Sequence, residues 1–167
     1  VLVKDTDENK ALLWAKEPVS SSKFGSSNVW QNSTVRTTLN GTWLNSTTVL
    51  KEKVVETTIT TRSQIGATTW ITTQDKVFLL SEADLFGTFN GSSTSNAQDY
   101  TYGTSQLVTN SSVRGFTNTS YGIYCWLRSP RDNSGRVAVV HDYAAAGYYG
   151  YSAACGVRPA LWFSLEE

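Results

Sequence analysis

The chain has 167 residues, of which 40% are hydrophobic and 17% are charged. Its 14 basic residues balance its 14 acidic ones, so no net field favours nucleic acid or an anionic membrane. No apolar run approaches the ~20 residues that span a bilayer, which argues against direct membrane insertion. The length suits a single domain over residues 1–167. No secretory signal is visible, so we expect any export signal to lie outside this chain.

The first predicted element is a strand over residues 10–19, which follows the turn "DTDEN". In that turn Asp5, Asp7 and Asn9 alternate as the ligands of a calcium loop do. Position 12 of such a loop would be Lys16, where a bidentate Glu is required. The pattern therefore favours a hairpin turn.

Two short helices are predicted next. In "NSTVRTTLNGTWLN" apolar residues recur at every fourth position from Val35 to Trp43, and Asn32 or Ser33 can cap the helix. The Asn-Gly pair at 40–41 can end it. The stretch "TTVLKEKVVET" predicts the second helix, with its apolar residues on one face.

The middle of the chain changes to strand chemistry. "TTITTRSQIGATTWITTQD" is rich in β-branched residues, and "KVFLL" (76–80) predicts a buried strand. Ser81 and Asp84 have the spacing of a capping box that starts a single helical turn. Residues 87–120 are predicted to form a long polar connection, and loops of that length are usually functional or flexible.

The last third again predicts strands. "GIYCWLRSP" alternates two sets of side chains, which predicts two differently filled faces. "RVAVV" and "GVRPALWF" predict two further strands, and Pro159 places the last one at an edge or a bulge. Helices early and strands late, with small antiparallel sheets and long irregular loops, predict an α+β domain.

The sequence contains few of the residue patterns that catalytic sites require. One histidine and two cysteines cannot make a recognisable zinc site, and no phosphate-binding glycine loop occurs. A catalytic triad could use only His141, whose neighbour Asp142 would point to the opposite face of a strand. We therefore predict a non-enzyme with no cofactor and no metal. An enzyme built around residues 87–120 stays open as the less favoured alternative.

Four segments in fixed order carry a family resemblance: "STVRTTLN" (33–40), "TTQDKVFLLS" (72–81), "CWLRSP" (125–130) and "GVRPALW" (156–162). Over residues 10–165 the chain resembles a bacterial surface-protein domain of unknown function with a WLRSP…GVRPAL pair near its end. The resemblance implies a C-type lectin-like fold, and more distantly that of the formylglycine-generating enzymes. Their paired active-site cysteines are not matched, and Cys125 stands where the family usually has a second Trp.

Some members of this lectin-like class are variable proteins of diversity-generating retroelements, in which copying errors at adenines rewrite the end of the gene. Asn codons can then become Tyr, Ser, Asp, His, Ala, Gly or Cys, but not Lys, Glu, Gln, Trp or Met. Residues 131–155 contain none of those five excluded types, although about four would be expected from the composition. The resemblance therefore implies a variable ligand-binding segment over 131–155. A loop of biased composition remains the alternative.

Half of the eight tyrosines lie between residues 143 and 151 on a Gly/Ala background, as on binding surfaces. We predict that they face a protein or glycan ligand on a cell surface, with the domain displayed outside a bacterium or on a phage particle. The predicted contact set is His141, Asp142, Tyr143, Tyr148, Tyr149, Tyr151, Ser152 and Ala153, flanked by Asp132 and Asn133. A non-diversified structural module and a calcium-dependent sugar site remain alternatives.

Two arginines and two cysteines lie in or beside the conserved-looking motifs. Arg128 and Arg158 are predicted to be buried scaffold residues that bond carboxylates or carbonyls. Cys125 and Cys155 could form a lectin-like disulfide, which would stabilise the fold by roughly 3.5 kcal/mol. We favour free thiols, because an Asn codon can become the Cys155 codon and two cysteines are weak evidence of an oxidising compartment.

Overall fold

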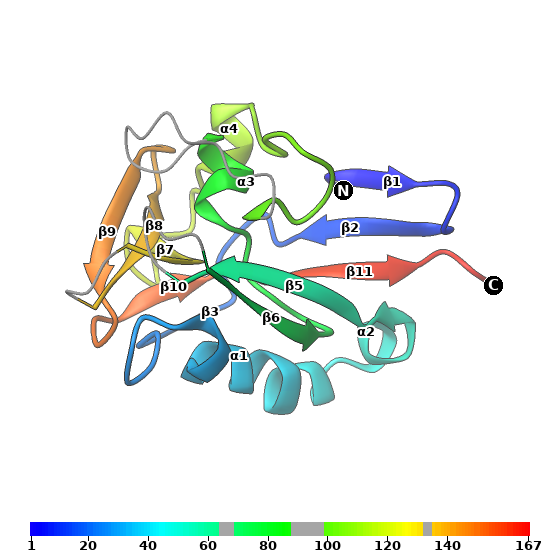
Figure 1. The fold of residues 1–167 in the computed structure, drawn as a ribbon, viewed down its shortest axis with the longest axis horizontal. Coiled ribbons are helices and arrows are strands. Elements are labelled where there is room, and N and C mark those ends of the chain that lie inside the picture. The colour runs from blue at the N-terminus through cyan, green and yellow to red at the C-terminus, as the bar shows by residue number, and fades with distance from the viewer. Residues whose placement is uncertain (64–68, 88–98, 132–134) are drawn as a thin grey trace.

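The computed structural model describes residues 1–63, 69–87, 99–131 and 135–167, and shows a mixed α+β architecture (Figure 1). The strands are β1 Val3–Asp5, β2 Lys10–Trp14, β3 Ser20–Ser22, β4 Val54–Val55, β5 Thr57–Arg62, β6 Trp70–Asp75, β7 Tyr124–Pro130, β8 Arg136–His141, β9 Ala146–Gly150, β10 Cys155–Val157 and β11 Ala160–Ser164. The α-helices are α1 Thr34–Thr38, α2 Thr48–Lys53, α3 Glu82–Phe86 and α4 Ser111–Arg114, with a 3₁₀ turn at Trp30–Asn32 and a π-helical turn at Leu39–Trp43.

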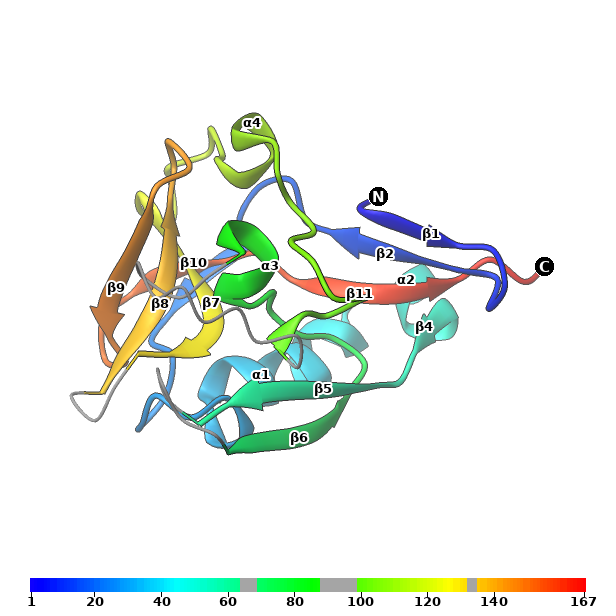
Figure 2. The same cartoon turned by 45° about the horizontal axis from the view of Figure 1, so that its top comes forward.

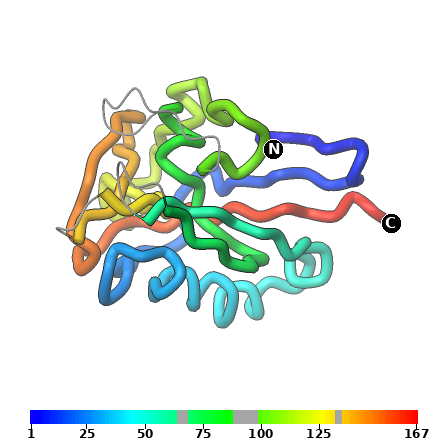
Figure 3. Tube along the Cα trace, viewed as in Figure 1, coloured from blue at the N-terminus to red at the C-terminus, as the bar shows by residue number. Residues whose placement is uncertain are grey.

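The strands form three sheets of different size. Four strands lie in the order β1-β2-β11-β4, five in the order β3-β10-β7-β8-β9, and β5 pairs with β6 alone. Both chain ends belong to the four-stranded sheet, while β8 and β9 lie at the opposite end of the molecule (Figures 1 and 2). The tube in Figure 3 shows the C-terminal strand beside the N-terminal hairpin, where β11 pairs with β2. The fold therefore presents the β8–β9 hairpin at one outer edge.

The motif "GVRPALWF" forms two strands where one was predicted. β10 pairs with β3 and β7 in the five-stranded sheet, whereas β11 pairs with β2 and β4 in the four-stranded sheet. Pro159 lies between them and has no N–H to donate to a ladder, so the chain changes sheets there. Its carbonyl accepts a hydrogen bond from the Ala15 N–H at 2.9 Å. The motif thus joins the two larger sheets.

Three other predictions of element boundaries were wrong. The strand predicted over 10–19 ends at Trp14, and in the segment 76–80 residues 77–80 are buried but form only one isolated bridge, between Phe78 and Ala160. The helix does not end at the Asn-Gly pair but continues through it. The reason is Asn40, whose Oδ1 accepts the N–H groups of residues 76 and 77, both at 2.9 Å. Its side chain ties the helix to the segment that would otherwise pair as a strand.

Local signals in the sequence were more accurate. β1 and β2 form the predicted hairpin, and Asp5 Oδ1 accepts two N–H groups of its turn. Ser33 caps α1 by accepting the Arg36 N–H at 3.1 Å. Ser81 and Asp84 make both bonds of a capping box at α3. Each of these features depends on residues within one turn of chain, which explains why the pattern predicts them.

Arg128 is the centre of a buried polar region. Its side chain is fully buried and donates to the carbonyls of Leu79 and Asp99, both at 2.8 Å. It also donates to Thr101 Oγ1 at 3.0 Å and pairs with Asp84 at 3.4 Å. These contacts join segments far apart in the sequence, and they confirm the prediction that Arg128 is buried and bonds a carboxylate and carbonyls.

Arg158 holds the end of α4 against the N-terminal sheet. Its guanidinium lies 3.5 Å from the ring centre of Trp14 and donates to the carbonyls of Ala15, Val113 and Arg114. Only 2% of the residue is exposed. Burial lowers the pKa of Arg158 to about 10, which still leaves it charged at neutral pH. The prediction that Arg158 is buried and bonds carbonyls is thus confirmed.

Candidate functional site

The β8–β9 hairpin carries most of the predicted contact residues. Its turn is closed by the His141 N–H, which donates to the Ala145 carbonyl at 2.8 Å, and Ala144 has a left-handed φ of 75°. β8 is buried from residue 137 to residue 140, while β9 forms the outer edge of the sheet. A buried strand therefore supports an exposed one.

Alternation along β9 sends its two adjacent tyrosines to opposite faces. Tyr149 lies across from Val137 and Tyr148 lies across from Ala138. The run of tyrosines is thus divided between two environments, which the spacing in the sequence did not predict.

Four rings from three segments form what we call the aromatic cluster: Tyr124, His141, Tyr143 and Tyr149. Ring centres are 4.6 Å apart for Tyr124 and His141, 4.5 Å for Tyr124 and Tyr149, and 3.6 Å for His141 and Tyr143. Tyr143 is 71% exposed and Tyr149 is 38% exposed. A hydrogen bond with Tyr149 raises the pKa of the Tyr124 hydroxyl. The Tyr124 and Tyr149 side chains therefore interact through their hydroxyls as well as through their rings.

Tyr124 was not among the predicted contact residues, because it lies outside the segment 131–155. The signal that could have identified it is pairing: Tyr124 is the partner of His141 between β7 and β8. Exposed Ile123 and Tyr121 precede it in the chain. The exposed aromatic surface therefore extends beyond the predicted segment.

Tyr148 points inward, contrary to the prediction that the whole run faces a ligand. Its hydroxyl donates to the carboxylate of Glu82, the buried first residue of α3. The guanidinium of Arg131 lies 4.1 Å from the centre of its ring. Burial and the bond to Glu82 raise the pKa of Tyr148 well above its usual range. Tyr148 therefore connects β9 to α3.

The remaining predicted contacts are divided. Tyr151 is half-buried against the core, and a side chain at Gly135 would lie 2.7 Å from its ring. Ala153 also packs against the core, whereas Ser152 is exposed. Asp132 and Asn133 lie outside the described residues. The structure brings together His141, Asp142, Tyr143 and Tyr149, and directs Tyr148 and Tyr151 partly inward.

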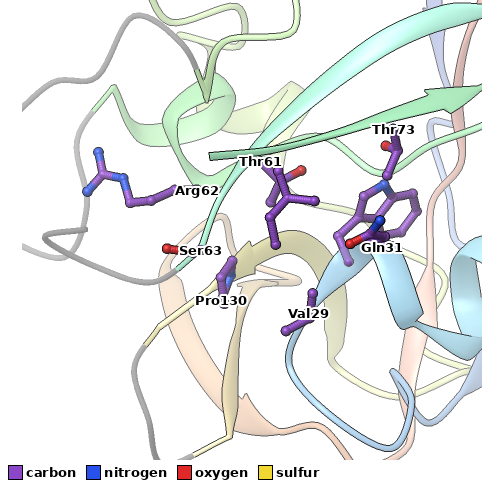
Figure 4. Close-up of a pocket in the computed structure, with 9 residues that line it drawn as sticks. Val29, Gln31, Thr61, Arg62, Ser63, Thr73 and Pro130 are labelled. Atoms are coloured by element: carbon purple, nitrogen blue, oxygen red, sulfur yellow. The ribbon is translucent and has the colours of Figure 1, made fainter. Parts of the chain in front are cut away.

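A cavity away from the aromatic cluster is too small to be a ligand site. It lies between the 3₁₀ turn, the β5–β6 hairpin and Pro130, and its volume is ≈ 10 Å³ (Figure 4). That space suits about one water molecule. The guanidinium of Arg62 points away from it in Figure 4 and pairs with buried Asp99 at 3.1 Å.

The cysteines and acidic residues give no sign of metal chemistry within the described ranges. There, no group of three or more His, Cys, Asp or Glu side chains could hold a metal ion. Cys125 and Cys155 are free and buried, and burial raises the pKa of each thiol to about 12. No helix in the part of the chain that the structure describes is long and apolar enough to cross a membrane.

Comparison with known proteins identifies the family but not its activity. A family model described as "Domain of unknown function (DUF6273)" matches residues 8–165, and so covers almost the whole chain. The chain belongs to this family. Neither the curated proteins nor the solved structures gave a match.

Proposed function

We propose that this DUF6273 domain is a ligand-binding module that presents the aromatic cluster to a protein or glycan target. The observation that carries the proposal is the exposure of Tyr143 and Tyr149 beside two further rings, on a hairpin whose inner strand is buried. Tyrosine supplies large, rigid, amphipathic contact area at low entropy cost. Clustered exposed rings of this kind are typical of interaction surfaces.

We further propose a C-type lectin-like fold for the domain. Support comes from the mixed α+β architecture and from the positions of the two characteristic motifs. "CWLRSP" lies in β7 in the middle of the five-stranded sheet, and "GVRPAL" forms the crossing from β10 to β11. Both motifs are buried, as constant scaffold segments should be.

Diversification by a retroelement is the third part of the proposal. Within residues 131–155, the buried positions 137–140 are aliphatic. Exposed Tyr143 and Tyr149 and the partly exposed His141 and Asp142 are residue types that an altered Asn codon can encode. Exposed positions tolerate substitution within about half a kcal/mol, whereas core positions do not. A variable surface on a constant strand is therefore physically consistent, and a domain of this kind would act on a bacterial cell surface or a phage particle.

Binding can be tested with labelled domain on two microarrays, one printed with glycans and one with bacterial surface proteins. The double substitution Tyr143→Ala and Tyr149→Ala should lower the affinity for any target by about 30-fold or more, since a central tyrosine contributes about 2 kcal/mol. The control is Tyr102→Ala, an exposed tyrosine that contacts Trp162 of β11, away from the cluster. Equal binding by the double variant and the wild type would contradict the proposal.

Diversification can be tested separately by sequencing the DNA around the gene. We expect a near-copy of the region that encodes residues 131–155, next to a reverse-transcriptase reading frame. The copies should differ almost only at adenines of the near-copy, in codons that include those of His141, Asp142, Tyr143 and Tyr149, but not the codon of inward-pointing Tyr148. Codons for buried Val137 and Val139 should be identical. Mismatches at all four bases alike would overturn the diversification but leave the binding proposal intact.

A further inference from the structure

A cleft lies beside the aromatic cluster, between α4 and the turn of the β8–β9 hairpin. Its volume is ≈ 330 Å³, at the lower end of the range for small-molecule sites. Tyr143 and Asp142 form one wall. Lys16, Ser111 and Thr117 belong to the other. The exposed ring of Tyr143 is thus both part of the aromatic cluster and the rim of this cleft.

The walls of the cleft are held in place by the protein backbone. The Glu17 carboxylate accepts the N–H groups of Thr117 at 3.0 Å and Asn118 at 2.8 Å, and these bonds lower the pKa of Glu17. The Phe116 N–H donates to the Asp142 carbonyl at 3.0 Å. A side chain at Gly115 would lie 2.4 Å from that same carbonyl, so glycine permits the close approach of the two walls. A cleft fixed in this way needs little rearrangement to bind a ligand.

The charged groups of the cleft differ in sign and in hydrogen-bonding role. Asp142 Oδ1 accepts the Tyr143 N–H at 3.1 Å and contacts His141 Nδ1, while Oδ2 has no hydrogen-bond partner in the described ranges. The Lys16 ammonium has no partner there either. A carboxylate only accepts and an ammonium only donates. A ligand that satisfies both therefore needs donor and acceptor groups on one small frame, and the many hydroxyls of a sugar provide both.

We propose that this cleft binds one neutral pyranose ring of a glycan. The apolar C–H face of the ring packs on Tyr143, one sugar hydroxyl donates to Asp142 Oδ2, and another accepts from Lys16. The Ser111 and Thr117 hydroxyls can both donate and accept, as a polyhydroxylated ligand requires. The inference rests on the proposed binding function and narrows its target to a glycan that is held without calcium.

The two walls also differ in their relation to the segment 131–155. Tyr143 and Asp142 lie inside it, whereas Lys16, Ser111 and Thr117 lie outside it. The constant wall can supply the same hydrogen-bonding groups to every sugar, while changes at Tyr143 and Asp142 on the opposite wall alter which sugar is preferred. The cleft would then combine one constant wall with one variable wall.

The test is a two-dimensional NMR titration of the ¹⁵N-labelled domain in EDTA. The probes are the methyl glycosides of glucose, galactose, mannose and N-acetylglucosamine. We expect at least one of them to shift the amide signals of Gly115, Thr117 and Tyr143 saturably. Lys16→Gln and Asp142→Asn should each weaken binding by about tenfold, because each removes a charge-assisted hydrogen bond. The matched controls are Lys51→Gln and Asp7→Asn, exposed residues outside the cleft.

The outcomes separate this inference from the proposed function. The inference is overturned if no glycoside shifts those signals, if binding requires calcium, or if it survives both cleft substitutions. A protein target on the array that depends on Tyr149 but not on Lys16 would overturn the sugar cleft and support the aromatic cluster. Sugar binding that depends on Lys16 and Asp142, with no array target that depends on Tyr149, would support the cleft and refute the wider surface.

Discussion

The surroundings of Arg128 and the aromatic cluster both gather polar and aromatic side chains around β7, yet they use them differently. Arg128 is fully buried and directs its donors to carbonyls and side chains of three other segments. In the aromatic cluster the rings of Tyr124 and Tyr149 pack against one another at an interplanar angle of 43°, and Tyr143 is mostly exposed. The polar groups around Arg128 are hydrogen-bonded within the protein. In the aromatic cluster, part of the ring surface stays exposed and can contact a partner.

The difference suggests a physical rule for separating scaffold from surface in this domain. A buried charge without its partners would be costly, so the Arg128 region must form whenever the chain folds. An exposed ring contributes little to folding, but it is already ordered when a ligand arrives. Substitutions should therefore affect stability in one region and binding in the other, and the following predictions test that separation.

The largest effect is expected from Arg128→Ala. Removing the guanidinium leaves buried Asp84 without its cationic partner and removes the donor to the Leu79 carbonyl, which should lower the free energy of unfolding by about 3–5 kcal/mol. Urea unfolding monitored by circular dichroism would measure the loss. Lys4→Ala, at an exposed position in β1, is the control and should change stability by less than about half a kcal/mol. A variant as stable as that control would refute the scaffold role.

A smaller but still large effect is expected from Arg158→Ala. It removes three hydrogen bonds to carbonyls and the stacking on Trp14, and should cost about 3 kcal/mol of stability. Affinity per folded molecule should stay unchanged, in contrast to the loss expected for the Tyr143 and Tyr149 double variant. Parallel unfolding and binding curves decide the matter. If Arg158→Ala weakened binding more than folding, the separation of the two regions would be wrong.

The adjacent tyrosines of β9 allow a matched comparison. Tyr148→Phe removes the hydroxyl that donates to buried Glu82, and should lower stability by about 1–3 kcal/mol. Tyr149→Phe removes a hydroxyl at a 38% exposed residue and should change stability by less than about half a kcal/mol. Thermal unfolding of the two variants measures the difference. Equal losses would mean that β9 does not divide its tyrosines between core and surface.

Features that depend on neighbouring residues could be predicted from the sequence. The Ser33 cap, the capping box at Ser81 and the hairpin after β1 all depend on side chains within a few positions. Arginines inside strongly apolar motifs were also correctly assigned to the scaffold, because a buried guanidinium must satisfy its donors within the protein. The α+β class followed from the same local patterns.

Features that depend on long-range contacts could not be predicted. Asn40 resembles a helix stop, but its side chain bonds residues 36–37 positions away and the helix continues. Tyr148 resembles its neighbour Tyr149, but its partner Glu82 lies 66 positions away. Tyr124 joins the aromatic cluster only through pairing with β8. Each of these outcomes is decided by which segments meet, and periodicity within one segment does not contain that information.

The smallest structural effect concerns the thiols. Cys155 closes the segment 131–155, yet it is buried in β10 and so belongs to the scaffold side of the comparison. Burial raises the pKa of Cys125 and Cys155 to about 12, so at pH 8 only roughly one thiol in ten thousand is the reactive thiolate. The native domain should therefore react with Ellman's reagent at least about a thousandfold more slowly than the unfolded chain.

The same shift fixes the sign of a pH effect. Because the folded pKa lies above the unfolded value, the contribution of the buried thiols to stability is complete below about pH 8.5 and is lost as the pH rises towards 12. Unfolding in guanidinium without reductant should release two thiols per chain. If no free thiols were detected after unfolding, Cys125 and Cys155 would form a disulfide. If the thiols of the native domain reacted rapidly, β10 would unfold locally together with the segment 131–155 and not with the core.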